Sequence, residues 1–196
     1  MTSVDRAAAA PESVVVRDAA DGDMVAVQTI YAHHVLHGLG SFEERPPDLE
    51  ELMGRRRALL DRGLPYLVAE AGGAICGYAY AGQFRPRPAY RFALEDSVYV
   101  APEALRRGIG RRLLRVLVDR CTALGYRQMI AVIGDSGNHG SIGLHVAAGF
   151  HRVAILPSMG FKFGRWVDLV IMQRALGAGG DTLPEALRQP SGATSF

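Results

Sequence analysis

The chain has 196 residues, of which 48% are hydrophobic and 21% are charged, and its formal net charge is +2. This composition is typical of a globular protein with one sizeable core, and the net charge is too small to indicate a nucleic-acid partner. No apolar run approaches the roughly 18 residues of a membrane-spanning helix, and the N-terminus lacks the apolar core of a signal peptide, so we expect a cytoplasmic protein without a membrane partner.

The first half of the chain is predicted to form a strand, two helices and a hairpin. A β-branched run predicts a strand at residues 13–19. Apolar residues at helical spacing, with acidic residues able to cap and glycines at the end, predict helices at 21–40 and 46–63. Two alternating runs at 65–84 surround a Gly-Gly pair, which is typical of a β-hairpin.

The second half is predicted to contain the most regular helix of the chain. A strand is expected at 92–100, and the helix follows at 106–125. The apolar stripe of this helix comprises Ile109, Leu113, Leu114, Leu117, Val118 and Cys121. The remaining predicted elements are a buried strand at 127–134, a loop with a short helix at 138–150, and strands at 151–157 and 166–176.

Strands and helices alternate irregularly, which favours a mixed α/β sheet over a doubly wound one. We expect one domain at residues 14–176, preceded by a flexible leader at 1–13 and followed by a flexible glycine- and proline-rich tail at 177–196. Cys76 and Cys121 both lie in apolar patterns, which predicts reduced, buried thiols.

Two glycines one residue apart, Gly108 and Gly110, stand at the start of the most regular helix. Glycine lets a ligand approach the backbone closely, and the free N–H groups of a first helical turn attract phosphate. Positive charge at this turn comes from Arg106, Arg107 and Arg111. The turn therefore predicts an anion site, although a tight helix entry with surface arginines is the structural alternative.

Two phosphate-binding motifs do not fit this turn. A Walker loop requires a lysine that is missing here, and a dinucleotide fingerprint requires a third glycine where the chain has Leu113. A nucleotide-binding regulator is therefore disfavoured.

A second motif, NHGSIGLHVAAGF at residues 138–150, follows the glycine turn after about thirty residues. Together the two motifs resemble the GNAT acetyltransferases, and most closely the phosphinothricin N-acetyltransferase branch. The resemblance extends from Val14 to Leu176 through the segments GSFEERPPDLEEL, AGQFRPRPAYRFALEDSVYV, RRGIGRRLL, AVIG and GFKFGRWVDLVIMQRAL.

The resemblance implies the GNAT fold, a central and mostly antiparallel sheet that splays between two strands and is flanked by helices. It also implies acetyl-CoA as co-substrate. The coenzyme-binding positions that it implies are Val98, Val100, Arg106, Arg107, Gly108, Ile109, Gly110, Arg111, Asn138 and Ser141. One position departs from the family pattern, because Leu105 stands where an arginine or glutamine is usual.

Acetyl transfer from a thioester to an amine requires removal of a proton from an ammonium, stabilisation of the thioester oxygen, and protonation or stabilisation of the leaving thiolate. Glu95, at a strand start among apolar neighbours, is the candidate base and matches the branch's catalytic glutamate, while Asp96 is the local rival. The resemblance implies that a backbone N–H of the strand at Val98 to Val100 stabilises the oxygen. His145 is the candidate acid, or a second base, because histidine titrates near neutrality.

Substrate selection is expected from a proline-stiffened loop that contains Arg85, Arg87 and Tyr90, because guanidinium groups pair with carboxylates and phosphinates. The resemblance adds Phe42 as an aromatic wall, and Lys162 and Trp166 as parts of a C-terminal signature. The alternatives are a cationic surface loop for the arginines and plain packing for the aromatic residues.

The sequence as a whole predicts an acetyl-CoA-dependent N-acetyltransferase that acts on the α-amine of a small amino-acid-like substrate with an anionic group. The resemblance further implies a homodimer. No metal is expected, because His33 and His37 lie one helical turn apart but no third ligand accompanies them. The alternatives are an N-acetyltransferase for another amine, such as an ordinary amino acid, an antibiotic or a protein N-terminus, and a non-catalytic acyl-CoA-binding module.

Overall fold

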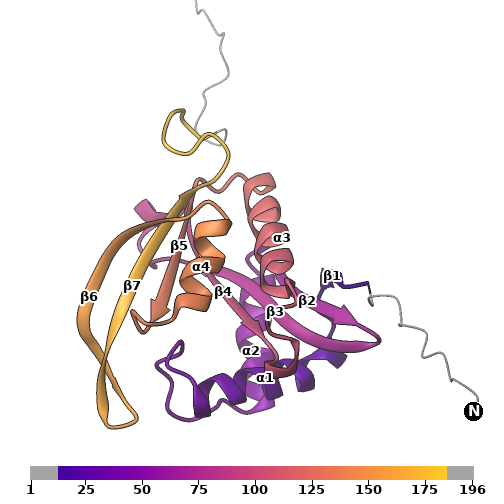
Figure 1. Ribbon diagram of the computed structural model, residues 1–196. Helices are drawn as coiled ribbons and strands as arrows, with labels where there is room; N and C mark the ends of the chain where they lie inside the picture. Colours follow the sequence, from indigo (N-terminus) through magenta and orange to yellow (C-terminus); the bar gives the residue numbers. More distant parts are fainter. Residues whose placement is uncertain (1–12, 185–196) are drawn as a thin grey trace, which may run out of the picture.

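The computed structural model describes residues 13–184 (Figure 1). Its strands are β1 (Val15–Asp18), β2 (Tyr66–Ala71), β3 (Ala74–Gln83), β4 (Ala93–Val100), β5 (Gln128–Gly134), β6 (His151–Lys162) and β7 (Arg165–Ala175). Its α-helices are α1 (Met24–His37), α2 (Leu49–Leu60), α3 (Ile109–Ala123) and α4 (His139–Ala147). Nearly all of the predicted leader and residues 185–196 of the predicted tail lie outside the described residues. The tail residues 177–184 lie inside them, and Arg127 Nη2 donates hydrogen bonds to the Thr182 and Leu183 carbonyl oxygens.

The seven strands form one sheet in the order β1-β2-β3-β4-β5-β7-β6. All neighbouring strands are antiparallel except β4 and β5. This mixed sheet with flanking helices confirms the predicted fold class. The parallel pairing covers only Ala93–Asp96 opposite Gln128–Ala131, so the two strands separate beyond those residues and the sheet opens into a splay.

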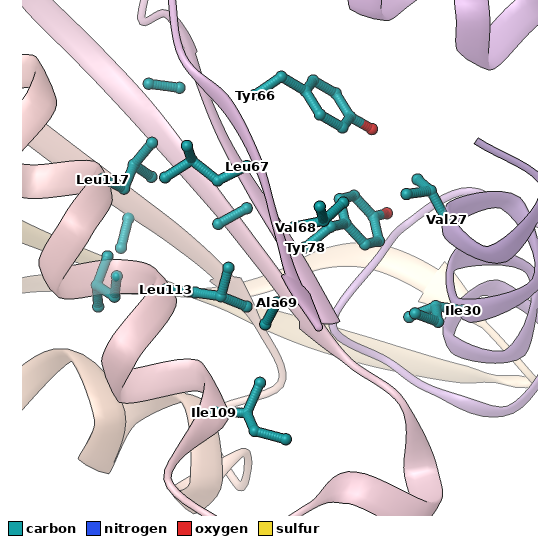
Figure 2. Close-up of a cluster of buried hydrophobic side chains, with 14 of the residues drawn as sticks. Val27, Ile30, Tyr66, Leu67, Val68, Ala69, Tyr78, Ile109, Leu113 and Leu117 are labelled. Atoms are coloured by element: carbon teal, nitrogen blue, oxygen red, sulfur yellow. The ribbon is translucent and has the colours of Figure 1, made fainter. Parts of the chain in front are cut away.

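The sheet separates two layers of helices, and its side chains alternate between them. Figure 2 shows Leu67 of β2 directed toward Leu113 and Leu117 of α3. Tyr78 of β3 is directed the other way, toward Val27 and Ile30 of α1. Helix α2 packs beside α1, and α4 packs beside α3 and β5. The protein core therefore consists of one layer on each face of the sheet, and the splay between β4 and β5 opens into both.

Helix α3 is anchored by the stripe that the sequence predicts. All six stripe residues are 3% exposed or less, and burial of one such aliphatic side chain contributes about 1.5–3 kcal/mol. Gly77 of β3 permits the close approach of the helix, because a Cβ there would lie 3.1 Å from Leu113 Cδ1 and 3.2 Å from Ile109 Cγ2. The first turn of α3 is therefore held tightly against the sheet.

Strand β6 extends further than the sequence predicts. The expected strand ends at Pro157, but β6 continues through a bulge to Lys162. Asp168 of β7 organises the bulge, because its carboxylate accepts hydrogen bonds from the Ser158 N–H at 3.0 Å and the Ser136 hydroxyl at 2.8 Å. Both hydrogen bonds lower the pKa of Asp168, and the bond from the Ser136 hydroxyl has the larger effect. Proline at this edge position interrupts the ladder without ending the strand. Within residues 13–184, no helix is both long and apolar enough to cross a membrane.

Candidate active site

The splay between β4 and β5 holds a cavity of about 1550 Å³. Its lining comes mainly from the two strands, the turn that leads into α3, helix α4, and residues 38–43 between α1 and α2, with further residues from α1, β3 and β7. The predicted site residues among its lining are Phe42, Glu95, Val98, Val100, Arg106, Gly108, Ile109, Gly110, Arg111, Asn138, Ser141 and His145. The structure thus brings both predicted motifs to one cavity.

The backbone of β4 faces the splay at every second residue. Ala93 O accepts a hydrogen bond from Phe84 N on the β3 side, whereas Phe92 O accepts one from Gln128 N on the β5 side. Because strand residues alternate, the N–H and C=O groups of Val98 and Val100 are directed into the splay. They present the edge of a sheet to which an extended ligand can add as a further strand.

His34 of α1 binds this edge, although the sequence analysis did not select it. Its Nε2 lies 2.9 Å from Val100 O. Burial lowers the pKa of His34 more than the Val100 carbonyl raises it, so the ring is neutral near pH 7 and Nε2–H donates. The open part of the β4 edge is consequently centred on Val98.

The glycine turn enters α3 with its backbone N–H groups uncapped by any side chain. Gly108 at the N-cap has φ 77°, a conformation that glycine adopts freely, and Arg106 has φ 60°. A Cβ on Gly110 would lie 3.2 Å from Leu144 Cδ2 and 3.5 Å from Val100 Cγ2, so any side chain there would narrow the cavity. The three turn arginines are exposed, and Arg107 does not line the cavity. The turn has the charge and the free donors of an anion site.

Helix α4 forms the opposite side of the cavity. Asn138 caps it, because its Oδ1 accepts a hydrogen bond from Ser141 N at 3.1 Å. Both residues are predicted coenzyme contacts. In this structure the Asn138 side-chain oxygen and the Ser141 N–H already form the hydrogen bond that caps the helix.

His145 of α4 and Asp96 of β4 form a buried ion pair at the narrow end of the splay. His145 Nε2 lies 3.0 Å from Asp96 Oδ2, and its Nδ1 lies 2.7 Å from the Ser141 carbonyl oxygen. Because the Ser141 carbonyl oxygen can only accept, Nδ1–H donates to it; opposite an ionised Asp96, Nε2–H donates as well and the ring is an imidazolium. Burial lowers the pKa of His145, but the hydrogen bond and charge of Asp96, with the Ser141 carbonyl, outweigh it and raise the pKa above its ordinary value. Asp96 Oδ1 is buried with no hydrogen-bond partner among residues 13–184.

This geometry changes the interpretation of His145. The sequence analysis predicts a proton donor or acceptor, but each ring nitrogen already donates to a protein oxygen. The pair instead ties α4 to β4 where the splay begins. No local sequence pattern predicts this contact, since the two residues lie 49 positions apart.

Glu95 lies on the opposite face of β4 from Asp96, since the two are neighbours in one strand. It is partly buried in the cavity, close to Tyr80 and Ser97 in the lining. Burial raises its pKa, Arg85 acts in the opposite direction, and Asp96 adds a further increase. A carboxylate with a raised pKa in a cavity has the properties of a general base.

Four predicted substrate contacts lie elsewhere in this structure. Arg85 is exposed and lines a separate cleft of about 380 Å³, with its guanidinium 4.7 Å from the centre of the Phe84 ring. Arg87 and Tyr90 are exposed and do not line the large cavity. Trp166 is 65% exposed, with its ring against Phe161. The site residues that the sequence analysis missed are mainly hydroxyl and acidic side chains on the Glu95 face: Tyr31, Ser41, Glu43, Tyr80, Ser97 and Tyr99.

Lys162 is also outside the cavity lining and is 3% exposed. Its ammonium donates to the carbonyl oxygens of Gly38 at 2.9 Å and Ser41 at 2.7 Å, so it is engaged with backbone and not directed at the cavity.

Comparison with known proteins identifies the class of protein that this fold and cavity define. Residues 28–150 match the model of the acetyltransferase (GNAT) family. The chain is 58% identical over 170 residues to a phosphinothricin N-acetyltransferase of Alcaligenes faecalis, which covers 87% of this chain and 86% of that protein. It is 39% identical to an L-methionine sulfoximine/L-methionine sulfone acetyltransferase of Salmonella typhimurium, over 83% of this chain and 95% of that protein.

A solved structure agrees with these relatives. The GNAT superfamily phosphinothricin acetyltransferase of Sinorhizobium meliloti, crystallised with AcCoA, superposes with a TM-score of 0.86 at 47% identity and covers 90% of this chain and 96% of that chain. The chain therefore belongs to the GNAT acetyltransferase family and is an N-acetyltransferase. Within the family it falls among the phosphinothricin and methionine sulfoximine acetyltransferases, which confirms the predicted resemblance.

Replacing Asp96 with asparagine is expected to lower the free energy of unfolding by about 3 kcal/mol, because it leaves the buried imidazolium without its counter-charge. The folded-state pKa of His145 is raised, so the contribution of the pair is complete below the unfolded pKa and is lost as pH rises through the folded pKa. The difference between wild type and Asp96→Asn in urea unfolding should thus be larger at pH 5.5 than at pH 9. Asp119→Asn, at an exposed position of α3, is the matched control. A pH-independent difference would contradict the ion pair.

Proposed function

We propose that this N-acetyltransferase transfers the acetyl group of acetyl-CoA to the α-amine of a small amino-acid-like substrate with an acidic or tetrahedral side-chain group. Phosphinothricin and methionine sulfoximine are the compounds that the names of its relatives suggest. The observation that carries the proposal is the partly buried Glu95, whose pKa burial raises, in a cavity that also contains an uncapped helix start and a free strand edge.

The reaction that we propose is direct transfer in a ternary complex. The Glu95 carboxylate accepts a proton from the substrate ammonium, directly or through water, and the amine nitrogen then attacks the thioester carbon. The C–N bond forms, the C–S bond breaks, and the coenzyme leaves as a thiolate that takes up the proton which the attacking nitrogen loses as it becomes an amide. The Val98 N–H, which is directed into the splay, is suited to stabilise the thioester oxygen as it gains charge.

We propose that acetyl-CoA lies along the β4 edge with its pyrophosphate at the start of α3. Three features support this placement: the direction of the Val98 and Val100 backbone groups, the free N–H groups behind Gly108, and the arginines at the turn. Leu105 is an exposed apolar residue at the rim of this turn, so backbone amides would provide most of the binding. The reaction as we propose it uses no metal.

We propose that the loop that carries Arg85, Arg87 and Tyr90, although it lies outside the cavity lining in this structure, receives the anionic group of the substrate, with Phe42 as an aromatic wall. The charge of Arg85 lowers the pKa of Glu95, which supports a role for this loop beside the proposed base. An anionic substrate suits such a loop, whereas a polycationic amine does not.

We further propose a cytoplasmic homodimer. Both cysteines are free and buried, as expected for a reducing compartment. Exposed apolar side chains gather on β6 and β7, among them Met159 at 55%, Phe161 at 56% and Trp166 at 65%, and β6 is an edge strand. An apolar patch at a sheet edge is typical of a protein interface.

The purified protein should release free thiol from acetyl-CoA in the presence of phosphinothricin or methionine sulfoximine. The measurement is thiol release across these two compounds, ordinary amino acids and a polyamine. Turnover confined to neutral amino acids would reject the anionic substrate class. Tight binding of acetyl-CoA with no turnover of any amine would favour the non-catalytic acyl-CoA-binding module.

Replacing Glu95 with glutamine should lower kcat about 100-fold or more at pH 7, because the side chain can no longer accept a proton. Since the pKa of Glu95 is raised, wild-type kcat/KM should rise with pH through the titration of this group. The variant should lose that step and recover partly at high pH, where free amine is abundant. Glu50→Gln, at an exposed position of α2, is the control. An unchanged pH profile in Glu95→Gln would remove Glu95 from the proposed mechanism.

Replacing Gly110 with valine should raise the Kd of acetyl-CoA about tenfold or more, because the new side chain would contact Leu144 and Val100 and cover the helix-start N–H groups. Arg106→Ala removes one exposed charge and should change this Kd by only about twofold to threefold. Calorimetric titration with acetyl-CoA measures both. A larger loss in Arg106→Ala would show that the side-chain charge dominates pyrophosphate binding.

A further inference from the structure

Residues 38–43 form one wall of the cavity, and four separate contacts hold this segment in place. Its backbone and side chains line the cavity without interruption from Gly38 to Glu43. A loop between two helices normally has the freedom to move, since it lacks a hydrogen-bonded ladder. These contacts come from β5, β6 and α1 and from within the wall, and an ion pair with α2 adds to them.

The first contact is made by Lys162 at the end of β6. Its ammonium donates to Gly38 O and Ser41 O, which lie three residues apart in the wall. A buried ammonium is costly to desolvate, and within residues 13–184 no carboxylate forms an ion pair with it. Burial lowers the pKa of Lys162, and the more distant Glu44 and Glu43 act in the opposite direction. The hydrogen bonds to the two wall carbonyl oxygens are therefore the main interactions that offset the cost of desolvating the ammonium.

The second contact is a slot for the Phe42 ring between two strands. A Cβ on Gly160 of β6 would lie 2.6 Å from Phe42 Cε2, and one on Gly134 of β5 would lie 2.9 Å from Phe42 Cε1. A Cβ on Gly134 would also overlap the Leu39 carbonyl oxygen. Only glycine at both strand positions leaves room for the wall in its present place.

Two further contacts come from Tyr31 and from within the wall. The Tyr31 and Ser41 hydroxyls are 3.1 Å apart in a buried hydrogen bond, and Ser41 Oγ also accepts from Glu43 N at 3.3 Å. Glu43 pairs with Arg55 of α2 at 2.6 Å. Glu43 also lines the cavity together with Glu95, Tyr31 and Tyr80.

We infer that Lys162 is a positioning residue: with Gly160, it clamps residues 38–43 against the sheet and so fixes the wall of the amine-acceptor site opposite Glu95. This inference rests on the proposed function for the identity of the acceptor, but not for the clamp itself. It replaces the sequence-based expectation that Lys162 contacts the substrate. The bulge at Ser158 contributes, because it sets the register that turns Gly160 and Lys162 inward while Phe161 stays exposed.

The test compares Lys162→Met with Arg152→Met, which removes a positive charge from an exposed position of the same strand. Hydrogen exchange of peptides covering residues 38–43 should become about tenfold faster in Lys162→Met and remain unchanged in Arg152→Met. The KM for the acceptor should rise about tenfold or more, whereas the KM for acetyl-CoA should change less than about twofold, since only one wall moves.

Gly160→Ala provides a second route to the same wall, because its methyl group would displace the Phe42 ring without removing any charge. It should reproduce the rise in acceptor KM, and the double variant should be little worse than either single one, because both displace one wall. This variant also decides the matter if Lys162→Met unfolds in a thermal melt.

Two outcomes would overturn the clamp. Unchanged exchange in residues 38–43 of a folded Lys162→Met protein would do so whether or not any amine is acetylated, so this result is independent of the proposed function. A selective loss of anionic over neutral acceptors in Lys162→Met, with normal exchange, would instead assign Lys162 to direct substrate contact. Failure of every acceptor to react, with faster exchange in the variant, would reject the proposed substrate class and leave the clamp intact.

Discussion

The parallel pairing of β4 with β5 ends at Asp96 and Ala131, and the whole site depends on that separation. Backbone N–H and C=O groups that would otherwise form hydrogen bonds between β4 and β5 are directed into a cavity instead, where they can bind an extended ligand. The separation is stabilised at its narrow end by the buried pair of Asp96 and His145. Further along β4, His34 Nε2 hydrogen-bonds the Val100 carbonyl oxygen, so this oxygen is not free to bind a ligand. The cavity of this N-acetyltransferase thus exists because the sheet is incomplete between β4 and β5.

Side chains of β4 alternate between the two faces of the sheet, so the strand contributes different residues to the two sides of the cavity. Even-numbered side chains such as Asp96 and Val100 lie on the face of α3 and α4, where Val100 approaches Gly110 at the helix start. Odd-numbered side chains such as Glu95 lie on the face of α1, among tyrosine hydroxyls and residues 38–43. One strand therefore separates the proposed coenzyme side from the proposed acceptor side. If the register of β4 shifted by one residue, Glu95 and Asp96 would exchange faces of the sheet. The proposed base would then no longer face the proposed acceptor side.

Hydrophobic periodicity was sufficient to locate the elements, because it reports burial directly. The stripe of α3 and the hairpin at Gly72 lie where the sequence places them, whereas β6 passes the expected end at Pro157 because Asp168 stabilises a bulge from the neighbouring strand. In the candidate active site, too, local sequence patterns do not show contacts between distant residues. Glycines and arginines near one helix start could be found locally, but the partners of His145 and Lys162 lie 49 and more than 120 positions away.

The sequence by itself determined the family, the strand–turn–helix with the features of an anion site, and the residue types that we propose for acetyl transfer. These features are local or depend on several motifs in a fixed order. Only the tertiary structure decided which titratable groups remain available for chemistry. Glu95 stays in the cavity with a raised pKa, while the His145 ring and the Lys162 ammonium are engaged by a carboxylate and by backbone carbonyls. The physical reason is that desolvation and pairing are set by neighbours in space, which residue type and spacing do not specify.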